Sequence, residues 1–221
     1  RVTTYELFAD PPDPLVPRWL RLPIDERVYS DGNILKPVQR EDIENAVEVM
    51  RAEDVTSVAI VFLHSYVNPK NEQTAAIYLK ELAPDIAVTL SSEVLPQIKE
   101  FERTSTTVVN AYVKPLAQQY LANLDKGLQS NKYKAPLHIM LSNGGLGSTK
   151  TAGDFPIRLI ESGPVAGAIV GRQLAELMGI KDVLSFDMGG TTAKACLIRN
   201  QALPITDELE VARSKHLTKK S

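Results

Sequence analysis

A segment that ends in a carboxylate and turns through two glycines and two threonines is the part of the sequence best suited to chemistry. Residues 183–186 (Val-Leu-Ser-Phe) precede Asp187, Gly-Gly-Thr-Thr follows at 189–192, and a second apolar run covers 193–198. Glycines adopt conformations barred to other residues and let the backbone approach a ligand closely. Successive backbone N–H groups in such a turn bind anions, and threonine hydroxyls add donors. A carboxylate beside a phosphate can hold Mg²⁺ or position an attacking water.

This pattern predicts a phosphate-binding hairpin in which Asp187 is both the catalytic and the metal-binding residue. Gly189, Gly190, Thr191 and Thr192 would bind the nucleotide. The stretch is neither a Walker A loop nor a Rossmann fingerprint, because its glycines lead into a strand rather than a helix. Strand–Asp-x-Gly-Gly-Thr-Thr–strand is instead typical of the phosphate hairpin of the actin and hexokinase type of ATPase fold. The alternative is a tight hairpin whose aspartate only caps its own turn.

Two other turns could add nucleotide-binding groups. Asn143, Gly144 and Gly145 follow an expected strand at 137–141, where a plain turn and a ligand site are equally compatible with the residues. Ser162 and Gly163 precede a proline and begin an expected helix at 162–178, with serine as the N-cap. The free amides at such a helix start could receive an anion. We therefore include these five residues among the candidate cofactor-binding positions.

Other polar residues favour structural interpretations. Glu102 and Arg103 precede a long helix and are expected at the surface. His64 follows an apolar run and is expected to be a structural histidine. Small residues four apart (Gly167, Gly171 and Ala175) indicate close packing of a helix.

Strands and helices alternate along the chain, which favours α/β architecture. Hydrophobic periodicity predicts helices at 41–52, 71–82 and 104–128. The last should carry an apolar stripe and should kink or restart at Pro115. The stripe residues are Val109, Tyr112, Val113, Leu116, Tyr120 and Leu124. Strands are expected at 55–64, 86–90, 137–141, 182–187 and 193–198, and Asp31-Gly32 marks a hairpin turn. We expect residues 1–135, with a proline-rich extended start, to end a first lobe. Residues 136–221 would open an incomplete second lobe with the phosphate hairpin.

Composition excludes several classes. The 221 residues carry 25 Lys and Arg against 27 Asp and Glu, a net charge of −2, so a nucleic-acid or anionic-membrane partner has no electrostatic support. No apolar run approaches the roughly 20 residues of a spanning helix. A single cysteine, Cys196, excludes an intrachain disulfide and favours the cytoplasm. Because the chain begins at Arg1 and ends in a polar, basic run, we expect a piece of a larger protein.

Several motifs, in order, resemble the hydantoinase A/5-oxoprolinase family. They are Phe62-Leu63-His64-Ser65-Tyr66, Ser91-Ser92-Glu93-Val94-Leu95-Pro96, the run from Glu102-Arg103-Thr104 to Asn110-Ala111-Tyr112, Ser142-Asn143-Gly144-Gly145, Ser162-Gly163-Pro164 and Phe186-Asp187-Met188-Gly189-Gly190-Thr191-Thr192. The resemblance covers nearly the whole chain. It implies an actin-like ATPase (ribonuclease H-like) fold. It also implies that this chain is part of a larger two-lobed protein.

The resemblance also implies ATP and Mg²⁺ as cofactors and a small-molecule substrate. In the amide branch of the family, ATP phosphorylates the carbonyl oxygen of a hydantoin or 5-oxoproline and water then opens the ring. In the acetone and acetophenone carboxylases, phosphorylation helps to activate the ketone enolate or bicarbonate. A hydantoinase B-type subunit or domain and an oligomeric assembly are also implied. The residues do not distinguish the two branches, and they identify neither the substrate nor ADP or AMP as the product.

Two departures limit what the resemblance implies. Lys194 stands where many members carry aspartate, so any role of that carboxylate is absent. The family's first Asp-x-Gly-Gly-Thr loop does not occur in this sequence, so we expect these 221 residues alone not to turn over ATP.

A sugar kinase is an alternative with the same kind of hairpin, but it would place the hairpin near its N-terminus, whereas about 180 residues precede it here. A non-catalytic nucleotide-binding module remains a further alternative.

Overall fold

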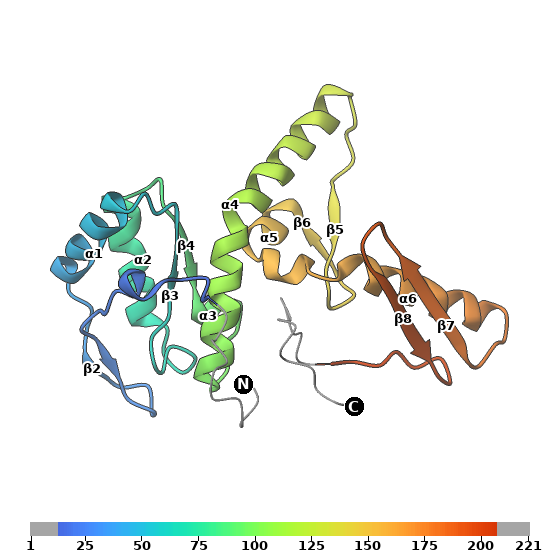
Figure 1. Ribbon diagram of the computed structural model, residues 1–221, viewed down its shortest axis with the longest axis horizontal. Helices are drawn as coiled ribbons and strands as arrows, with labels where there is room; N and C mark the ends of the chain where they lie inside the picture. The colour runs from blue at the N-terminus through green and yellow to red at the C-terminus, as the bar shows by residue number, and fades with distance from the viewer. Residues whose placement is uncertain (1–12, 207–221) are drawn as a thin grey trace. The chain divides into compact units, whose positions relative to one another are not determined.

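The computed structural model describes residues 13–206, which fall into two compact units. One unit is Arg18–Ala166, and the other comprises residues 167–206 with residues 13–17. Helices and strands alternate through both units (Figure 1), which confirms the predicted α/β class. Within the described residues, no helix has both the length and the hydropathy needed to cross a bilayer. The basic run at 214–221 lies outside the described residues.

The unit Arg18–Ala166 begins with a short 3₁₀ helix and a hairpin. The 3₁₀ helix η1 spans Arg18–Leu20, and β1 (Arg27–Val28) pairs antiparallel with β2 (Ile34–Lys36). Gly32 has a φ of +89°, which favours glycine, and the Asp31 carboxylate accepts a hydrogen bond from the Asn33 amide at 3.0 Å. The expected turn at Asp31-Gly32 is therefore confirmed.

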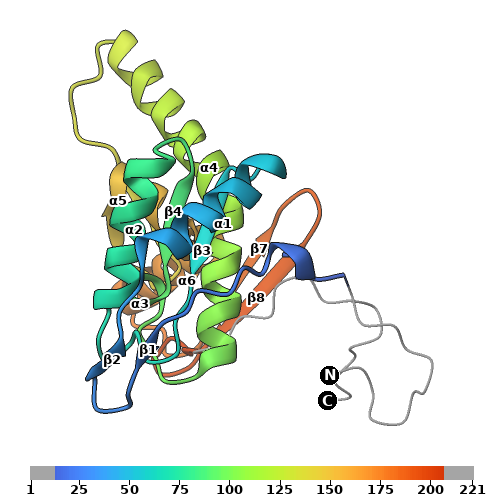
Figure 2. The ribbon, with the colours of Figure 1, turned by 90° about the vertical axis from the view of Figure 1, so that its left-hand side faces the viewer.

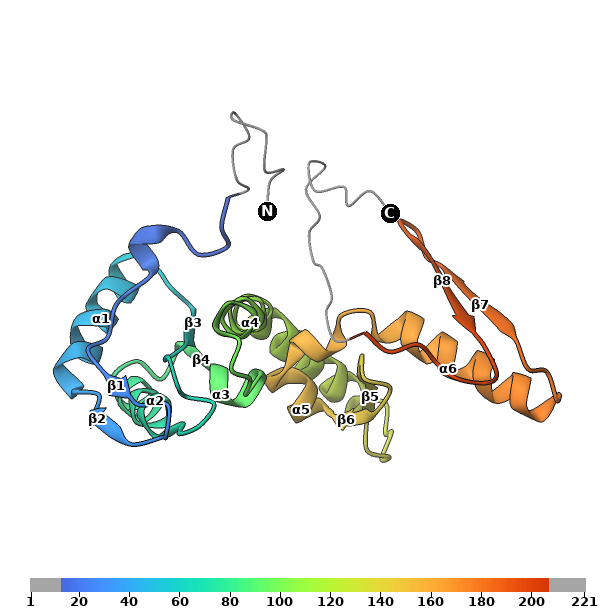
Figure 3. The same cartoon turned by 90° about the horizontal axis from the view of Figure 1, so that it is seen from below.

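A parallel strand–helix–strand unit holds the main core. β3 (Ser57–Ile60), α2 (Lys70–Leu82) and β4 (Ala87–Leu90) follow in order, with Ser57 opposite Ala87. α1 (Arg40–Ala52) packs beside α2 because its apolar residues recur with helical period. Figure 3 shows α1 and α2 on one side of the two strands and α4 on the other. The buried cluster is Val38, Ile43, Ala46, Val47, Met50, Ile60, Ala75, Leu79, Ala83, Ile86 and Leu90.

The long helix buries a different face from the one we expected. α4 (Glu100–Ser130) contains Pro115 and continues through it as one helix, and the short α3 (Ser91–Val94) precedes it. Tyr112, Leu116 and Tyr120 of the expected apolar stripe are 69%, 70% and 65% exposed. The other three stripe residues, Val109, Val113 and Leu124, are half-buried. The buried residues are instead mainly polar or small: Arg103, Thr107, Asn110, Ala111 and Leu121. The stripe prediction was therefore wrong for three of its six residues, and the most deeply buried face of α4 carries polar side chains that bond backbone carbonyls and an amide of neighbouring segments.

A second hairpin and two short helices complete this unit. β5 (His138–Met140) pairs antiparallel with β6 (Leu146–Ser148), and α5 (Thr149–Asp154) and the 3₁₀ helix η2 (Pro156–Leu159) follow. The Ser148 hydroxyl caps α5 by accepting from the Thr151 amide at 3.1 Å. α5 packs against α4, and Figure 2 shows this unit from the side of α1 and α2. Asn110 joins the two helical segments, since its side chain donates to the Asp154 carbonyl and accepts from the Ile157 amide, both at 3.1 Å.

The second unit contains an antiparallel hairpin packed on a helix. β7 (Val183–Met188) pairs with β8 (Ala193–Ile198) along its whole length. α6 (Ser162–Leu177) begins in the first unit, and its residues from Gly167 onward belong to the second. The helix ends as expected at Gly179, where φ is +68° and the amides of Gly179 and Ile180 bond back to the carbonyls of Glu176 and Ala175.

Candidate functional site

The hairpin β7–β8 brings five of the predicted site residues together at its tip. Asp187 is the second-last residue of β7, and it is paired directly with Lys194 of β8. The turn between the strands contains Gly189, Gly190, Thr191 and Thr192, and it is closed by a hydrogen bond from the Gly189 amide to the Thr192 carbonyl at 2.9 Å. Asp187 and all four turn residues are exposed. A carboxylate, backbone amides and two hydroxyls are thus available to a ligand.

The two turn glycines are not required by the hairpin's own conformation. Neither Gly189 nor Gly190 has a positive φ, so the turn does not use the conformational freedom that glycine offers. A Cβ at Gly190 would meet no described atom within 4 Å, and one at Gly189 would meet only the Thr192 carbonyl oxygen, at 3.9 Å. Neither backbone strain nor packing among the described residues explains glycine here. Close approach of a ligand to the backbone remains as a reason for both glycines.

α6 supports one face of the hairpin. A Cβ at Gly171 would lie 3.5 Å from the Ser185 Cβ and 3.8 Å from the Ile198 Cδ1, so the absent side chain lets helix and sheet approach closely. Ala175 is 2% exposed and Ile198 is fully buried. The predicted packing role of the small residues is therefore confirmed. Because side chains alternate along a strand, Ser185 and Asp187 lie on the same face as Ile198 and Lys194.

The turn at Asn143 is explained by its own geometry. It joins β5 to β6, Gly144 has a φ of +83°, and the Asn143 side-chain oxygen accepts from the Gly145 amide at 2.9 Å. The Leu141 amide also donates to the Gly145 carbonyl at 2.9 Å. These features are those of a turn stabilised by an asparagine side chain. Nucleotide binding by Asn143, Gly144 and Gly145 remains a prediction.

The start of α6 leaves two amides before the first helical hydrogen bond. The Glu161 carbonyl accepts from the Val165 amide at 3.2 Å, so Glu161, with a φ of +65°, holds the N-cap position that we expected for Ser162. A Cβ at Gly163 would meet no described atom within 4 Å. Ser162 and Gly163 lie in the unit Arg18–Ala166, whereas the hairpin lies in the other unit. Their role in anion binding remains a prediction.

Sequence reasoning missed a buried polar network at the carboxyl ends of β3 and β4. Glu72 is fully buried and its carboxylate accepts from the Phe62 amide at 3.0 Å, from the Ser91 hydroxyl at 2.5 Å, and from the Ser92 amide and hydroxyl at 2.9 and 2.7 Å. Arg103 is also fully buried, so the expectation of a surface side chain was wrong. Glu72 lies one turn before Ala75 on the buried face of α2, which was the available signal for that residue, whereas the α4 neighbours of Arg103, Thr107 and Asn110, are polar and gave none.

Arg103 holds the loop that follows β3. Its guanidinium donates to the carbonyls of Phe62, Leu63 and Gln97 at 3.0, 2.8 and 2.6 Å, and it lies over the Tyr66 ring at 5.4 Å. Within the described residues, the Nδ1 atom of His64, in the same loop, is buried without a hydrogen-bond partner. The arrangement fixes the loop 62–66, which carries one of the family-like motifs.

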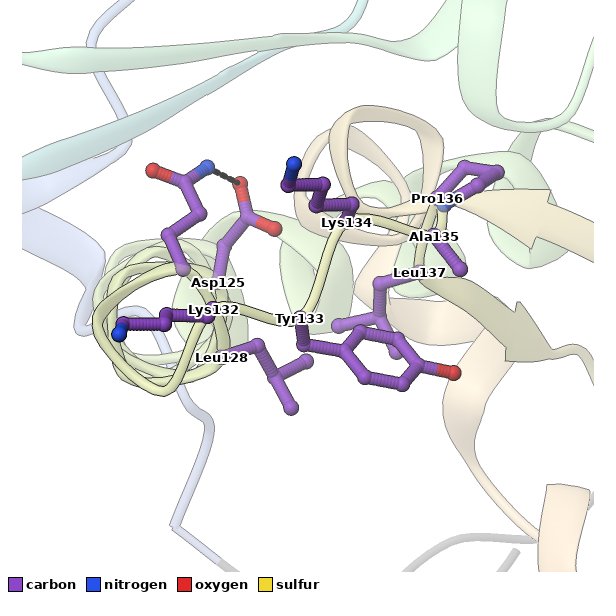
Figure 4. Close-up of a pocket in the computed structure, with 9 residues that line it drawn as sticks. Asp125, Leu128, Lys132, Tyr133, Lys134, Ala135, Pro136 and Leu137 are labelled. Atoms are coloured by element: carbon purple, nitrogen blue, oxygen red, sulfur yellow. Dashed lines mark hydrogen bonds between the residues drawn. The ribbon is translucent and has the colours of Figure 1, made fainter.

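A groove at the carboxyl end of α4 contains none of the predicted site residues. It encloses about 570 Å³ and is lined by Asp125, Leu128, Gln129 and residues 132–137 (Figure 4). The Gln129 amide donates to the Asp125 carboxylate at 3.4 Å. Among residues 13–206, no group of three or more His, Cys, Asp or Glu is placed to hold a metal. A Mg²⁺ held by one carboxylate together with substrate phosphates needs no such group.

The sequence matches two family models. Residues 1–83 match the hydantoinase/oxoprolinase N-terminal region, and residues 103–219 match hydantoinase/oxoprolinase.

Three curated relatives are similar over most of this chain. An uncharacterised protein of Methanocaldococcus jannaschii is 41% identical and aligns with 98% of this chain and 32% of its own length. Caprolactamase subunit alpha of Pseudomonas jessenii is 38% identical (85% of this chain, 27% of that protein). The acetone carboxylase beta subunit of Xanthobacter autotrophicus is 32% identical (90% and 28%). The chain spans about a third or less of the length of these relatives.

Two solved structures share the fold. The ATP-dependent caprolactamase of Pseudomonas jessenii superposes with a TM-score of 0.75 at 36% identity, over 88% of this chain and 28% of that one. The nucleotide-free acetone carboxylase gives a TM-score of 0.71 at 30% identity, over 80% and 25%. These similarities confirm the expected actin-like ATPase fold and the expectation that this chain corresponds to part of larger proteins.

Proposed function

Because this chain belongs to the hydantoinase/oxoprolinase family, we propose that it forms part of an ATP-dependent enzyme that opens a cyclic amide. The caprolactamase similarity supports an amide substrate, since caprolactam is a cyclic amide. The hydantoin and 5-oxoproline types expected from the sequence belong to the same chemical class.

The observation that carries the proposal is the exposed tip of β7–β8. Gly190 has neither a positive φ nor a described neighbour that a Cβ would meet, yet it lies between a carboxylate and two threonine hydroxyls. An anion lying against the backbone accounts for a glycine at this position. Triphosphate oxygens would accept hydrogen bonds from the turn amides and from Thr191 and Thr192.

The residues present fit ATP with Mg²⁺. Asp187 is exposed beside the amide-lined turn, as a carboxylate must be to hold Mg²⁺ through water or to orient an attacking water. ATP supplies a phosphoryl group that turns the amide oxygen into a good leaving group. Lys194, paired with Asp187, adds a positive charge on the same face of the hairpin. The chain's own contribution is to orient the phosphates and to balance their charge.

A second candidate is the ATP-dependent carboxylation of a ketone. Its support is the similarity to acetone carboxylase, in both sequence and fold. The hairpin roles would be the same, since phosphoryl transfer makes the same electrostatic demand in both reactions. The relatives named as subunits support assembly with other subunits, and we propose a hydantoinase B-type partner, fused or separate, and a cytoplasmic location.

The test is phosphate release by the full-length protein with its partner under MgATP. The substrates are caprolactam, 5-oxoproline, N-methylhydantoin, and acetone with or without bicarbonate. We expect a cyclic amide to stimulate phosphate release and to yield the ring-opened acid. Stimulation by acetone only when bicarbonate is present would replace the proposal with the carboxylase. Nucleotide binding without stimulation by any substrate would favour a non-catalytic module.

A further inference from the structure

A polar cavity lies between β4, α3, α4 and α5, within the unit Arg18–Ala166. It encloses about 350 Å³, which is within the range of small-molecule sites. Its polar lining comes from four elements of the chain: Thr89, Glu93, Lys114, Lys150 and Asp154. The motif at 91–96 supplies only Glu93 and Val94 of this lining. None of the lining residues belongs to the hairpin β7–β8.

Lys114 brings a positive charge to the inner wall of this cavity. Its ammonium donates to the Val88 carbonyl at 2.7 Å, the one acceptor that the described residues give it. An ammonium carries three hydrogens, so it retains donors for a second acceptor. Burial lowers the pKa of Lys114, while the charges of Asp154 and Glu93 oppose that shift. An anionic group bound beside Lys114 would offset the desolvation of the ammonium.

Thr89 supplies an unpaired hydroxyl in the same wall. The residue is 3% exposed, and its Oγ1 is closed to bulk solvent without a hydrogen-bond partner among residues 13–206. Leaving such a group unpaired lowers stability, which a bound partner would recover. An acceptor bound in the cavity would give this hydroxyl the partner that it lacks once the Thr89 side chain turns toward it.

The opposite charge lies on other parts of the lining. Glu93 is exposed, and Asp154 is paired with Lys150 at 2.6 Å on α5. Lys150 is therefore neutralised locally, whereas Glu93 has no ion pair among those that the structure gives. The cavity thus combines an ammonium, a hydroxyl and a carboxylate from three different elements.

We propose that this cavity binds a small zwitterion, with its carboxylate at Lys114 and Thr89 and its ammonium at Glu93. Linear amino acids of five or six carbons suit the charges and the volume. The opening of an unsubstituted lactam gives a molecule of this class. The choice of this class rests on the proposed opening of a cyclic amide, whereas the binding test involves neither nucleotide nor the hairpin β7–β8, so the two can fail separately.

The experiment is isothermal titration calorimetry on the full-length protein without ATP. The probe is 6-aminohexanoate, and hexanoate and hexylamine each carry one of its charges. We expect saturable binding of 6-aminohexanoate, and binding at least about tenfold weaker for each single-charge analogue. Absence of binding, or equal binding of hexanoate, would overturn the proposal. Occupation of the cavity by another segment of the protein would appear as absence of binding.

Three variants locate the site. Lys114→Met removes the ammonium but keeps most of the stem, and Glu93→Gln changes an exposed side chain that cannot disturb the core. Each should weaken 6-aminohexanoate binding about tenfold. Lys126→Met is the control, because it alters an exposed lysine of α4 that does not line the cavity. This variant should bind 6-aminohexanoate with the affinity of the wild type. If Lys114→Met fails to fold, Glu93→Gln alone decides, and unchanged affinity in that variant overturns the proposal.

Discussion

Asp187 and Lys194 face each other directly across the hairpin β7–β8, one pair before the turn that follows Met188. Side chains of directly paired residues project from the same face of a sheet, with Cβ atoms about 4.5–5.5 Å apart. The hairpin therefore presents a carboxylate and an ammonium side by side, next to the amides of the turn. The Asp187 carboxylate could bind the Mg²⁺ of MgATP, and the Lys194 ammonium could bind one of its phosphates.

Asp187→Asn should lower kcat for ATP-dependent phosphate release in the full-length protein by about a hundredfold or more. The amide is nearly isosteric but removes the negative charge, and the exposed position leaves the fold unchanged. Steady-state phosphate release with the identified substrate measures the effect. Asp125→Asn is the matched control, because Asp125 lies on α4. Wild-type kcat in Asp187→Asn would remove Asp187 from the mechanism.

Gly190→Val should weaken MgATP binding at least about tenfold without lowering thermal stability. The structure offers open space for the new side chain, so a loss of affinity would report a ligand lying against the backbone. Gly127→Val adds the same atoms where a Cβ also meets no described neighbour, but in α4, and should leave nucleotide affinity unchanged. The measurement is a nucleotide titration together with a melting curve. Equal affinity in Gly190→Val and wild type would argue for a plain turn.

The sequence predicted the hairpin closely because its signals are local. The run 193–198 became β8 without a shift, and 182–187 differs from β7 by one residue at each end. An apolar run on each side of a glycine turn specifies two strands without distant information. The helix stop at Gly179 was predictable for the same reason, since a C-terminal glycine satisfies the last carbonyls locally.

The buried face of α4 and the charges beneath the loop 62–66 could not be predicted in this way. Arg103 is buried where it donates to three carbonyls of two other segments. Glu72 is buried where it accepts from the loop after β3 and from the first residues of α3. These contacts form only after distant segments have packed. Hydrophobic periodicity therefore selected Tyr112, Leu116 and Tyr120, which are exposed among the described residues.

Arg103→Met should destabilise the full-length protein by several kcal/mol, since each buried carbonyl left without its donor costs about 1–3 kcal/mol. The carbonyls of Phe62, Leu63 and Gln97 would lose the donor that Arg103 gives them. Arg40→Met is the control, because the ion pairs of Arg40 with Glu44 and Glu81 are exposed and screened by solvent, so their loss should change stability far less. Urea unfolding midpoints compare the two. A similar loss of stability in Arg103→Met and Arg40→Met would contradict the role of Arg103 in holding the loop 62–66.

Gly171→Leu and Gly171→Ala should have opposite effects on stability. A Cβ alone would meet Ser185 at 3.5 Å, an ordinary contact, so alanine should be neutral or stabilise by up to about 1 kcal/mol through helix propensity. Leucine would enter the space of Ser185 and Ile198 and should destabilise by about 1–3 kcal/mol. Thermal melting of the full-length protein distinguishes the two. A stable leucine variant would mean that α6 and the hairpin are not tightly packed in solution.

Lys114 and Lys150 should give opposite contributions to the pH dependence of stability. Burial lowers the pKa of Lys114 below its ordinary 10.5, whereas the Asp154 carboxylate raises the pKa of Lys150 above it. Between the lowered pKa and 10.5, the unfolded chain binds more protons at Lys114 than the folded one, so this group's contribution becomes more favourable as pH rises. The contribution of Lys150 is fully present below 10.5 and is lost as pH rises through its folded pKa.

Urea unfolding of the wild type, Lys114→Met and Lys150→Met from about pH 8 to about pH 11 resolves these contributions, because that range brackets the ordinary lysine pKa. The stability of the wild type relative to Lys114→Met should increase across the range. Relative to Lys150→Met it should stay constant at first and then decrease. The exposed ion pair of Lys150 gives the smaller effect, since solvent screens it. A flat difference for Lys114 would mean that its ammonium is fully hydrated, and the cavity wall would then be open to solvent at that residue.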